Sequence, residues 1–151
     1  IQCIQLALGA KSGEAFLSDE MSSGTRHMVA DGQGTAIKVG ITTLEEWVTR
    51  AQLPKIDFIK IDVEGFEEDV LIPARNVMIK FMPIVCFEFI LDVACRRSSY
   101  GGEVLFPFFA DLGYIVMRLD KDGQAREDCS AARDWTNDYL AVPPRFLSRW
   151  R

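Results

Sequence analysis

The sequence predicts an α/β fold formed by a single domain of residues 1–151. Three observations favour this fold. Strand-like segments alternate with segments of helical periodicity along the chain. The segment 56–63 is apolar on both faces, as expected of a central parallel strand covered by helices on both sides. A turn and a final strand close the alternation, which predicts an antiparallel pair at the C-terminal end.

The N-terminal third is predicted to be mostly extended. Residues 1–8 alternate weakly and end at Gly9, which indicates a strand closed by a turn. Two further extended pieces are expected at 14–17 and 36–39. The polar stretch 18–34 between them is rich in Gly, Ser and Asp, so we expect a surface loop there.

A capping box predicts the first helix. Thr43 is followed three residues later by Glu46, and apolar residues then repeat at helical spacing, so a short helix is expected over about 43–51. Pro54 ends it before the strand at 56–63 begins.

A glycine turn and a second helix follow that strand. Gly65 permits a turn, and an apolar stripe from Phe66 to Val77 predicts a helix, with Pro73 at a break or at the first position of a new turn. The acids 67–69 then fall in the first helical turn, where negative charge is favoured by roughly 0.3–1 kcal/mol each.

The remaining elements complete the alternation. They are a buried strand at 84–89, a helix at about 102–112 ending at Gly113, a strand at 114–119, a turn, and a last strand at 138–142.

Composition narrows the class of protein. The chain is 48% apolar and 26% charged, which is typical of a folded soluble domain. Its net charge of -5 disfavours nucleic acid as a partner, and its apolar runs fall short of the roughly 20 residues that cross a membrane. The four cysteines are far apart and form no CxxC pair, which favours a reducing cytoplasm.

Charged residues gather at the predicted carboxyl ends of two parallel strands. Asp62 and Glu64 follow one strand, and Glu88 lies near the end of the next. Open α/β sheets bind ligands at this edge. Lys60 points to the same side as Asp62 and can neutralise it. The residues alone leave two interpretations open: a ligand site, or a structural Lys60–Asp62 pair with Glu64 capping the next helix.

Other candidate sites are weaker. His27 is the only histidine, which excludes histidine-rich zinc sites and favours an ordinary loop residue. The glycines at 31–34 and 100–102 match neither the dinucleotide nor the P-loop pattern. The basic C-terminal residues 145–151 are more typical of a solvated or docked tail than of a nucleic-acid site.

Five segments together resemble the FkbM-type family of S-adenosylmethionine-dependent methyltransferases. The most distinctive is "IDFIKIDVEGFEEDVL", followed about 20 residues later by "MPIVCFEF". The others occur in the family's order: "LALG" at 6–9, "VGITTLEEWV" at 39–48 and "NDYLAVP" at 137–143.

The resemblance implies a Rossmann-like class I methyltransferase sheet, mostly parallel with an antiparallel C-terminal strand pair. Residues 1–8 would be its third strand, 56–63 its fourth, 84–89 its fifth, and the final pair its sixth and seventh. S-adenosylmethionine would lie over the carboxyl ends of the first strands, and the acceptor would enter near the fourth and fifth.

The resemblance also implies roles for the charged residues. Asp62 and Glu64 would orient a hydroxyl acceptor or assist its deprotonation, Lys60 would keep Asp62 ionised, and Glu88 would be a second acid at the rim. The expected reaction is O-methylation of a hydroxyl on a small molecule, sugar or polyketide.

The cofactor-binding residues expected here are Gln5, Ala7 and Asp62, and no metal is expected. The family's glycine-rich cofactor loop and ribose-binding acid are not found in the sequence, so its first two strands would lie upstream of Ile1. The gap would expose an edge of strand 56–63. Residues 1–8 would then pair with that strand or stay detached, or a second chain would cover the edge in a homo-oligomer.

Two alternatives remain at this point. The first is a non-catalytic α/β remnant or interaction module in which the acids are structural. The second is a magnesium enzyme that uses Asp62, Glu64 and Glu88 as ligands. Acceptor choice would be determined by the loops 18–35 and 92–103.

Overall fold

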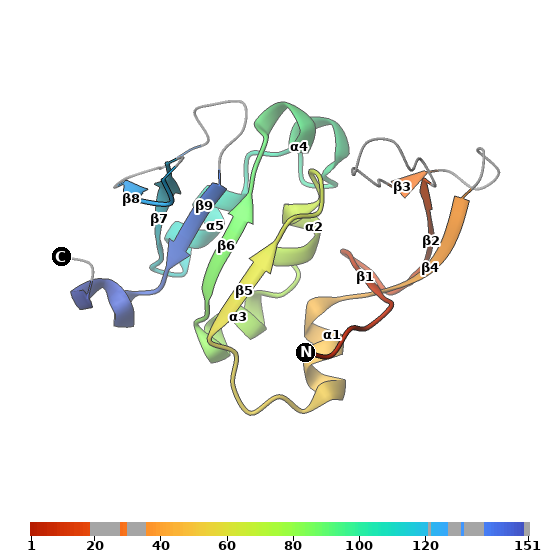
Figure 1. The fold of residues 1–151 in the computed structure, drawn as a ribbon, viewed down its shortest axis with the longest axis horizontal. Coiled ribbons are helices and arrows are strands. Elements are labelled where there is room, and N and C mark those ends of the chain that lie inside the picture. Colours follow the sequence, from red (N-terminus) through yellow and green to blue (C-terminus); the bar gives the residue numbers. More distant parts are fainter. Residues whose placement is uncertain (19–27, 30–35, 121, 127–130, 132–137, 150–151) are drawn as a thin grey trace.

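A computed structural model shows a mixed α/β protein whose strands form two separate sheets (Figure 1). It describes residues 1–151 except 19–27, 30–35, 121, 127–130, 132–137 and 150–151. Most of the predicted loop 18–34, including His27, therefore lies outside the described residues, as do parts of the C-terminal tail.

The larger sheet has five strands in the order β5-β6-β9-β7-β8. Their bounds are β5 Phe58–Ile61, β6 Ile84–Glu88, β7 Ile115–Leu119, β8 Ala125–Arg126 and β9 Asp138–Val142. Among the described strands of this sheet, β5 and β6 are the one parallel pair, and β9 pairs antiparallel with both β6 and β7. The predicted antiparallel C-terminal pair is confirmed. The sheet was predicted to be mostly parallel, but β5 and β6 form a parallel pair and the other described pairs in it are antiparallel.

The smaller sheet has four strands in the order β1-β4-β2-β3. Their bounds are β1 Ala7–Leu8, β2 Gly13–Ser18, β3 Met28–Val29 and β4 Ala36–Thr42. The extended pieces predicted at 14–17 and 36–39 are thus paired strands, whose antiparallel ladder joins Gly13 to Ile41 and Ser18 to Ala36.

The predicted strand at 1–8 is shortened to β1. Ala7 and Leu8 pair in parallel with β4, so of the alternatives expected for residues 1–8, direct pairing with 56–63 is excluded and separation from that strand is observed. Among the described residues, β5 has a strand neighbour on one side only, and Figure 1 shows β1 standing apart from it. A second chain at this edge remains a prediction.

The first helix, α1 (Leu44–Ala51), forms as its capping box predicts. The Thr43 hydroxyl accepts a hydrogen bond from the Glu46 N–H at 3.1 Å. The helix ends at Gln52, which adopts the left-handed conformation with φ 49°, so the chain turns before it reaches Pro54.

The helix predicted from Phe66 to Val77 is divided in two, the helix predicted at 102–112 is shorter, and two further helical segments follow β6 and β9. The bounds of these segments are α2 Glu67–Leu71, α3 Arg75–Phe81, α4 Leu91–Arg97, α5 Leu105–Asp111 and a final 3₁₀ turn, η1 Pro144–Arg149. The expected break at Pro73 is confirmed, because it separates α2 from α3. The helix α4 was not predicted from the sequence, and its N-cap residue, Ile90, makes no side-chain capping bond. None of the helices in the described part of the chain is long and apolar enough to span a membrane.

The main core lies between one face of the five-stranded sheet and helices α2, α3 and α5 (Figure 1). Aromatic rings fill it: Phe87 stacks on Phe109 at 5.3 Å between ring centres and on Tyr139 at 5.5 Å. The opposite face carries a smaller cluster around Met117, Leu140 and Val142. Phe58 is 56% exposed, so the prediction that β5 is covered on both faces fails at this residue.

Candidate active site

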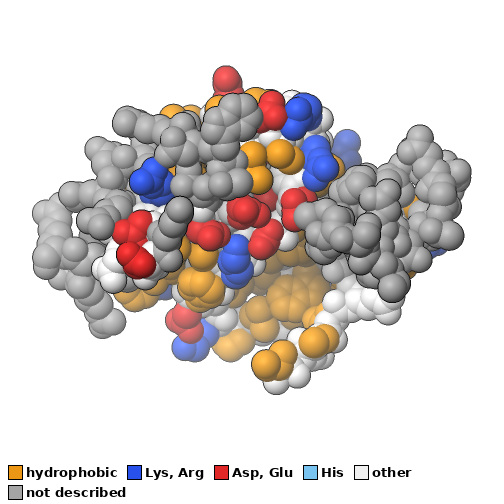
Figure 2. All heavy atoms as spheres, turned by 45° about the horizontal axis from the view of Figure 1, so that its top comes forward, with side chains coloured by type: hydrophobic (Ala, Val, Ile, Leu, Met, Phe, Trp, Pro, Cys, Tyr) orange, Lys and Arg blue, Asp and Glu red, His pale blue; other side chains and the backbone are white. Residues whose placement is uncertain are grey.

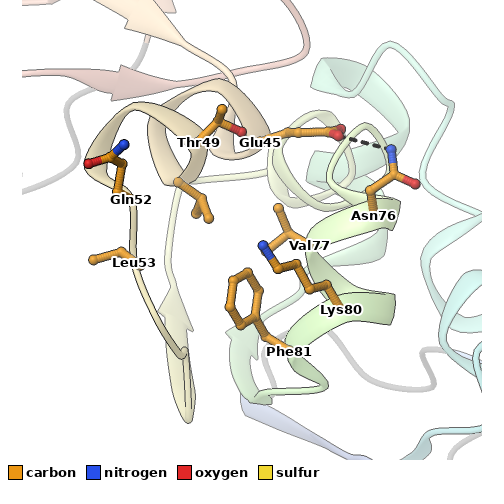
Figure 3. Close-up of a pocket in the computed structure, with 9 residues that line it drawn as sticks. Glu45, Thr49, Gln52, Leu53, Asn76, Val77, Lys80 and Phe81 are labelled. Carbon is orange, nitrogen blue, oxygen red and sulfur yellow. Dashed lines mark hydrogen bonds between the residues drawn. The ribbon is translucent and has the colours of Figure 1, made fainter.

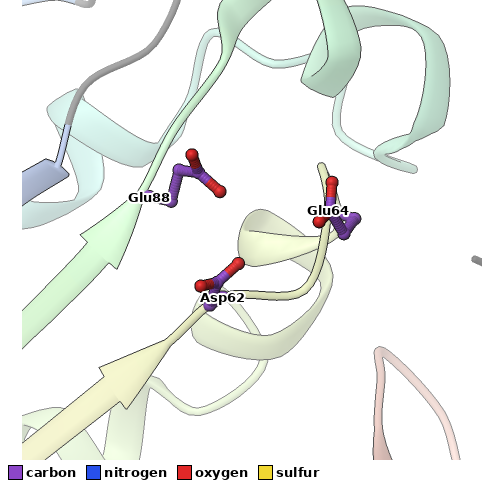
Figure 4. Close-up of side chains that lie close together, drawn as sticks. All are labelled: Asp62, Glu64 and Glu88. Atoms are coloured by element: carbon purple, nitrogen blue, oxygen red, sulfur yellow. The ribbon is translucent and has the colours of Figure 1, made fainter. Parts of the chain in front are cut away.

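The carboxyl ends of β5 and β6 bring together the three acids that the sequence singled out. Asp62 follows β5 directly, Glu64 lies two residues further on, and Glu88 ends β6. Each offers one oxygen, and these oxygens all lie within 4.8 Å of one another. The three side chains point into a common space (Figure 4). The predicted convergence at one end of the sheet is confirmed.

Lys60 connects this group to a further acid. Its Nζ lies 3.5 Å from Asp62 Oδ2 and 3.5 Å from Asp138 Oδ1. Burial lowers the pKa of Lys60, but attraction to the two carboxylates outweighs this effect and leaves its pKa above the ordinary value. Figure 2 shows acidic side chains gathered around a basic one on this face. The Lys60–Asp62 pair is confirmed, and its half-exposed groups make it worth at most about 1 kcal/mol.

Sequence reasoning missed Asp138. It is the first residue of β9, and the antiparallel register places it opposite Glu88. The sequence contains the signal, an acid at the start of the last strand, but the signal is uninformative until β9 is known to pair with β6.

Glu88 has an unusual electrostatic environment. Partial burial raises its pKa, and the charges of Asp62 and Glu64 raise it further, together with a hydrogen bond to Asp62. A hydrogen bond between two carboxyl groups requires a shared proton. Burial and the neighbouring negative charges therefore both favour the protonated form of Glu88.

A tight turn presents Glu64. The Phe66 N–H donates to the Val63 carbonyl at 3.4 Å, and the two central residues have positive φ, 55° at Glu64 and 95° at Gly65. This pattern of φ angles is that of a type I′ turn, which favours Asn or Gly over Glu at its first central position. A Cβ at Gly65 would lie 2.6 Å from Val93 Cγ1, so the turn also requires a residue without a side chain at this position.

Glu67 and Arg97 bind the backbone of this turn. Glu67 Oε1 accepts from the N–H groups of Val63 and Gly65, both at 3.2 Å, and Arg97 Nη1 donates to the Glu64 carbonyl at 2.7 Å. Burial raises the pKa of Glu67, while its backbone hydrogen bonds act in the opposite direction. Its second oxygen, Oε2, is buried with no hydrogen-bond partner among the described residues.

The neighbouring acids have structural partners. Glu68 is fully buried and accepts four hydrogen bonds, from the Ser98 hydroxyl and from the N–H groups of residues 102, 104 and 105. Asp69 accepts from the Ser99 N–H at 3.0 Å. The acids 67–69 do lie in the first turn of α2, as predicted, but they are buried, and they bind the turn at 63–65 and the segment 98–105.

Gln5 and Ala7 lie away from the carboxylate group. Ala7 is in β1 of the smaller sheet, and Gln5 is an exposed residue that precedes this strand. In Figure 1, β1 stands apart from β5. Their contact with a cofactor stays a prediction.

A separate cavity of about 290 Å³ lies between α1 and α3 (Figure 3). Its apolar wall includes Val48, Val77 and Phe81, and a hydrogen bond of 2.9 Å from Asn76 to Glu45 crosses its rim. None of the three clustered carboxylates lines it. This cavity could not be predicted from the sequence, because its lining comes from two segments that lie far apart along the chain.

The chemistry of the carboxylate group suits a cationic or hydroxyl-bearing ligand. Carboxylates attract cations and accept hydrogen bonds from hydroxyl groups, so Asp62, Glu64 and Glu88 together can bind either kind of ligand. Three oxygens within 4.8 Å also satisfy the spacing that a bound divalent cation requires, although exposed acids commonly gather without one.

Comparison with known proteins identifies a family. The family model of the methyltransferase FkbM domain matches residues 1–116, which is more than half of the chain. Neither the curated proteins nor the solved structures yielded a match.

Proposed function

Because the chain belongs to the FkbM methyltransferase family, we propose that it uses S-adenosylmethionine to methylate a hydroxyl group on a small molecule, sugar or polyketide. The observation that supports this most is the meeting of Asp62, Glu64 and Glu88 at the carboxyl ends of two parallel strands. A class I methyltransferase sheet, extended beyond β5 by further parallel strands, is part of the proposal.

Each charged residue of the group has a role in the proposed reaction that follows from its surroundings. Lys60 neutralises part of the charge of Asp62 and holds its side chain in place. Asp62 and Glu64 supply negative potential and hydrogen-bond acceptors at the rim, which orient the acceptor hydroxyl. Glu88 takes the proton from that hydroxyl, since a raised carboxyl pKa makes the group a stronger base. S-adenosylmethionine supplies the methyl group.

The acceptor would approach from α4 and the loop that follows it. Both lie at the same end of the sheet as the carboxylates (Figure 1). Three exposed apolar residues occur in this region: Leu91, Tyr100 and Val104, each 36–39% exposed. Such side chains suit the apolar parts of a small molecule or the faces of a sugar ring. The other predicted acceptor loop, 18–35, lies largely outside the described residues.

Calorimetry tests cofactor binding. We expect S-adenosylmethionine to bind to the protein, and Asp62→Asn to weaken that binding. Asp57→Asn is the matched control, because Asp57 pairs with Lys55 in front of β5 and is not part of the carboxylate group. S-adenosylhomocysteine, which lacks the sulfonium charge, should be less sensitive to Asp62→Asn. Absence of binding, or equal losses in both variants, would contradict the proposal.

A divalent cation is the second candidate ligand, favoured by the spacing of the three oxygens. Magnesium would then raise the melting temperature of the wild-type protein, and the effect would be lost in Asp62→Asn. A melting curve insensitive to magnesium would leave the acids to the roles assigned above.

A further inference from the structure

The peptide group between Glu64 and Gly65 is held at both of its ends. Its carbonyl, on Glu64, accepts from Arg97 Nη1 at 2.7 Å. Its N–H, on Gly65, donates to Glu67 Oε1 at 3.2 Å. The carbonyl and N–H of a trans peptide point in opposite directions, so two partners on opposite sides fix its rotation.

This restraint acts on an unfavourable conformation. Glu64 has φ 55°, in the left-handed region that residues with a Cβ adopt at a cost. Gly65, with φ 95°, adopts its conformation freely. Strained residues persist only where the surrounding structure determines them, and they cluster at functional sites. Here the strained residue is the one whose carboxylate joins Asp62 and Glu88.

We propose that Glu67 and Arg97 are positioning residues, which hold the Glu64–Gly65 peptide and thereby fix the Glu64 carboxylate beside Asp62 and Glu88.

The two residues come from elements on either side of the turn. Glu67 begins α2, only two residues after the turn, and also binds the Val63 N–H. Arg97 ends α4, more than 30 residues further along the chain. Glu67 thus fixes the turn locally, whereas Arg97 ties it to the helix that follows Glu88. Arg97 touches no carboxylate oxygen of the group in any described contact, so its influence on the site passes through the backbone of Glu64.

Glu88 provides a measure of where Glu64 lies, because the charge of Glu64 is one cause of the raised Glu88 pKa. The experiment is a carbon-13 titration of the Glu88 carboxyl in the labelled protein, with a chelator present, together with backbone couplings that report φ of residue 64. Glu64→Gln sets the midpoint expected when the Glu64 charge is lost. Arg97→Met removes the donor, and Arg96→Met is the matched control.

Arg96 suits this purpose because it lies on the same helix, carries the same charge and pairs with Asp92 at 2.6 Å. We expect Arg97→Met to lower the Glu88 midpoint toward that of Glu64→Gln, to change φ of residue 64, and to have no further effect in the Glu64→Gln background. Arg96→Met should leave the midpoint where it is, and Arg97→Lys should restore it.

Two results would overturn the proposal. One is an unchanged Glu88 midpoint with unchanged φ at residue 64 in Arg97→Met. The other is a raised midpoint, which is what loss of a nearby cation alone would cause. Should Arg97→Met not fold, Arg97→Gln, which is polar but too short to reach the carbonyl, gives the same comparison.

Glu67 is tested in parallel. Glu67→Gln keeps one acceptor oxygen for the two N–H groups and should preserve the geometry of residue 64, whereas Glu67→Met should lower the Glu88 midpoint as Arg97→Met does. The inference rests on the proposed function only in treating Glu64 as part of the site. Its readouts follow geometry and not methyl transfer, so a protein that binds no S-adenosylmethionine can still confirm or refute it.

Discussion

Replacing Glu64 by asparagine should make the protein more stable and remove a group that its site needs. Glu64 occupies the first central position of a type I′ turn with φ 55°. The left-handed conformation costs a residue with a Cβ roughly 1–2 kcal/mol, and asparagine tolerates this conformation far better. If half of the strain is relieved, Glu64→Asn stabilises the fold by about 0.5–1 kcal/mol. For a domain of this size that corresponds to a rise in melting temperature of roughly 1–4 °C.

Glu64 lies among carboxylates, so replacing it also removes a negative charge that affects stability. The effect of this charge has to be separated from the effect of backbone strain. Glu64→Gln removes the same charge but keeps a long side chain that is strained at positive φ, so the difference between the two variants isolates the backbone contribution. Glu64→Gly also relieves the strain, but glycine raises the conformational entropy of the unfolded chain, which costs roughly 0.5–1 kcal/mol of stability. The stability of Glu64→Gly should therefore be close to that of the wild type.

Urea unfolding followed by circular dichroism measures these differences, provided that the slope with denaturant is equal in all variants. The reasoning is refuted if Glu64→Asn is no more stable than Glu64→Gln. Both variants should bind S-adenosylmethionine more weakly than wild type if Glu64 belongs to the site. A gain in stability combined with a loss of function is expected where a strained residue is retained for its chemistry.

Three further substitutions probe the surroundings of the site. Glu88→Gln should stabilise the protein at pH 7. The folded-state pKa of Glu88 is raised, so the free energy of unfolding of the wild type falls as pH rises above the ordinary pKa of 4.5. Urea titrations at pH 7 and at a pH below 4.5 should show that the variant loses this gain at the lower pH. Glu68→Leu should cost about 3–5 kcal/mol in the same assay, since buried N–H groups at 102 and 105 lose their acceptor, and Glu68→Gln should cost less. Gly65→Ala should lower the melting temperature more than Gly123→Ala: both glycines have positive φ, but only a Cβ at Gly65 meets another side chain, that of Val93. Equal effects of the two glycine substitutions would show that the contact with Val93 is unimportant.

Local signals predicted the elements that depend on local interactions. The capping box at Thr43 and Glu46 predicted α1, because both partners of that hydrogen bond lie within four residues. The apolar run after Pro83 predicted a buried strand at 84–89, and β6 forms there with Val85 and Phe87 buried. The break at Pro73 follows from the chemistry of proline alone.

Long-range pairing was not accessible in this way. Residues 1–8 alone do not predict that β1 pairs with β4 rather than with β5, because strand pairing depends on contacts between residues far apart in the sequence. The helix α4 has no side-chain cap to reveal its start. The resemblance to a family predicted a mostly parallel sheet, whereas the described strands that complete the larger sheet are antiparallel.

The sequence predicted the three clustered acids of the candidate site but not the residues that hold them in place. Asp62, Glu64 and Glu88 were identified because the ends of parallel strands meet at one edge. The acids 67–69 were expected to favour the helix through its dipole, and their larger role depends on partners that the sequence could not place. The donors to Glu68 lie 30–37 residues away in the sequence, and Glu67 accepts a hydrogen bond from the preceding turn.

The electrostatics of the site favour a cationic ligand. Asp62, Glu64, Glu88 and Asp138 meet at one end of the sheet, and Lys60 is the cation that the described residues bring into ion-pair contact with two of them. Proton uptake at Glu88 relieves part of the repulsion, in keeping with its raised pKa. A bound cation would relieve more of it, and would lower the Glu88 pKa in doing so. Binding of a sulfonium ligand should therefore release protons near the raised Glu88 pKa, whereas an uncharged analogue should not, because the analogue leaves the carboxylates uncompensated.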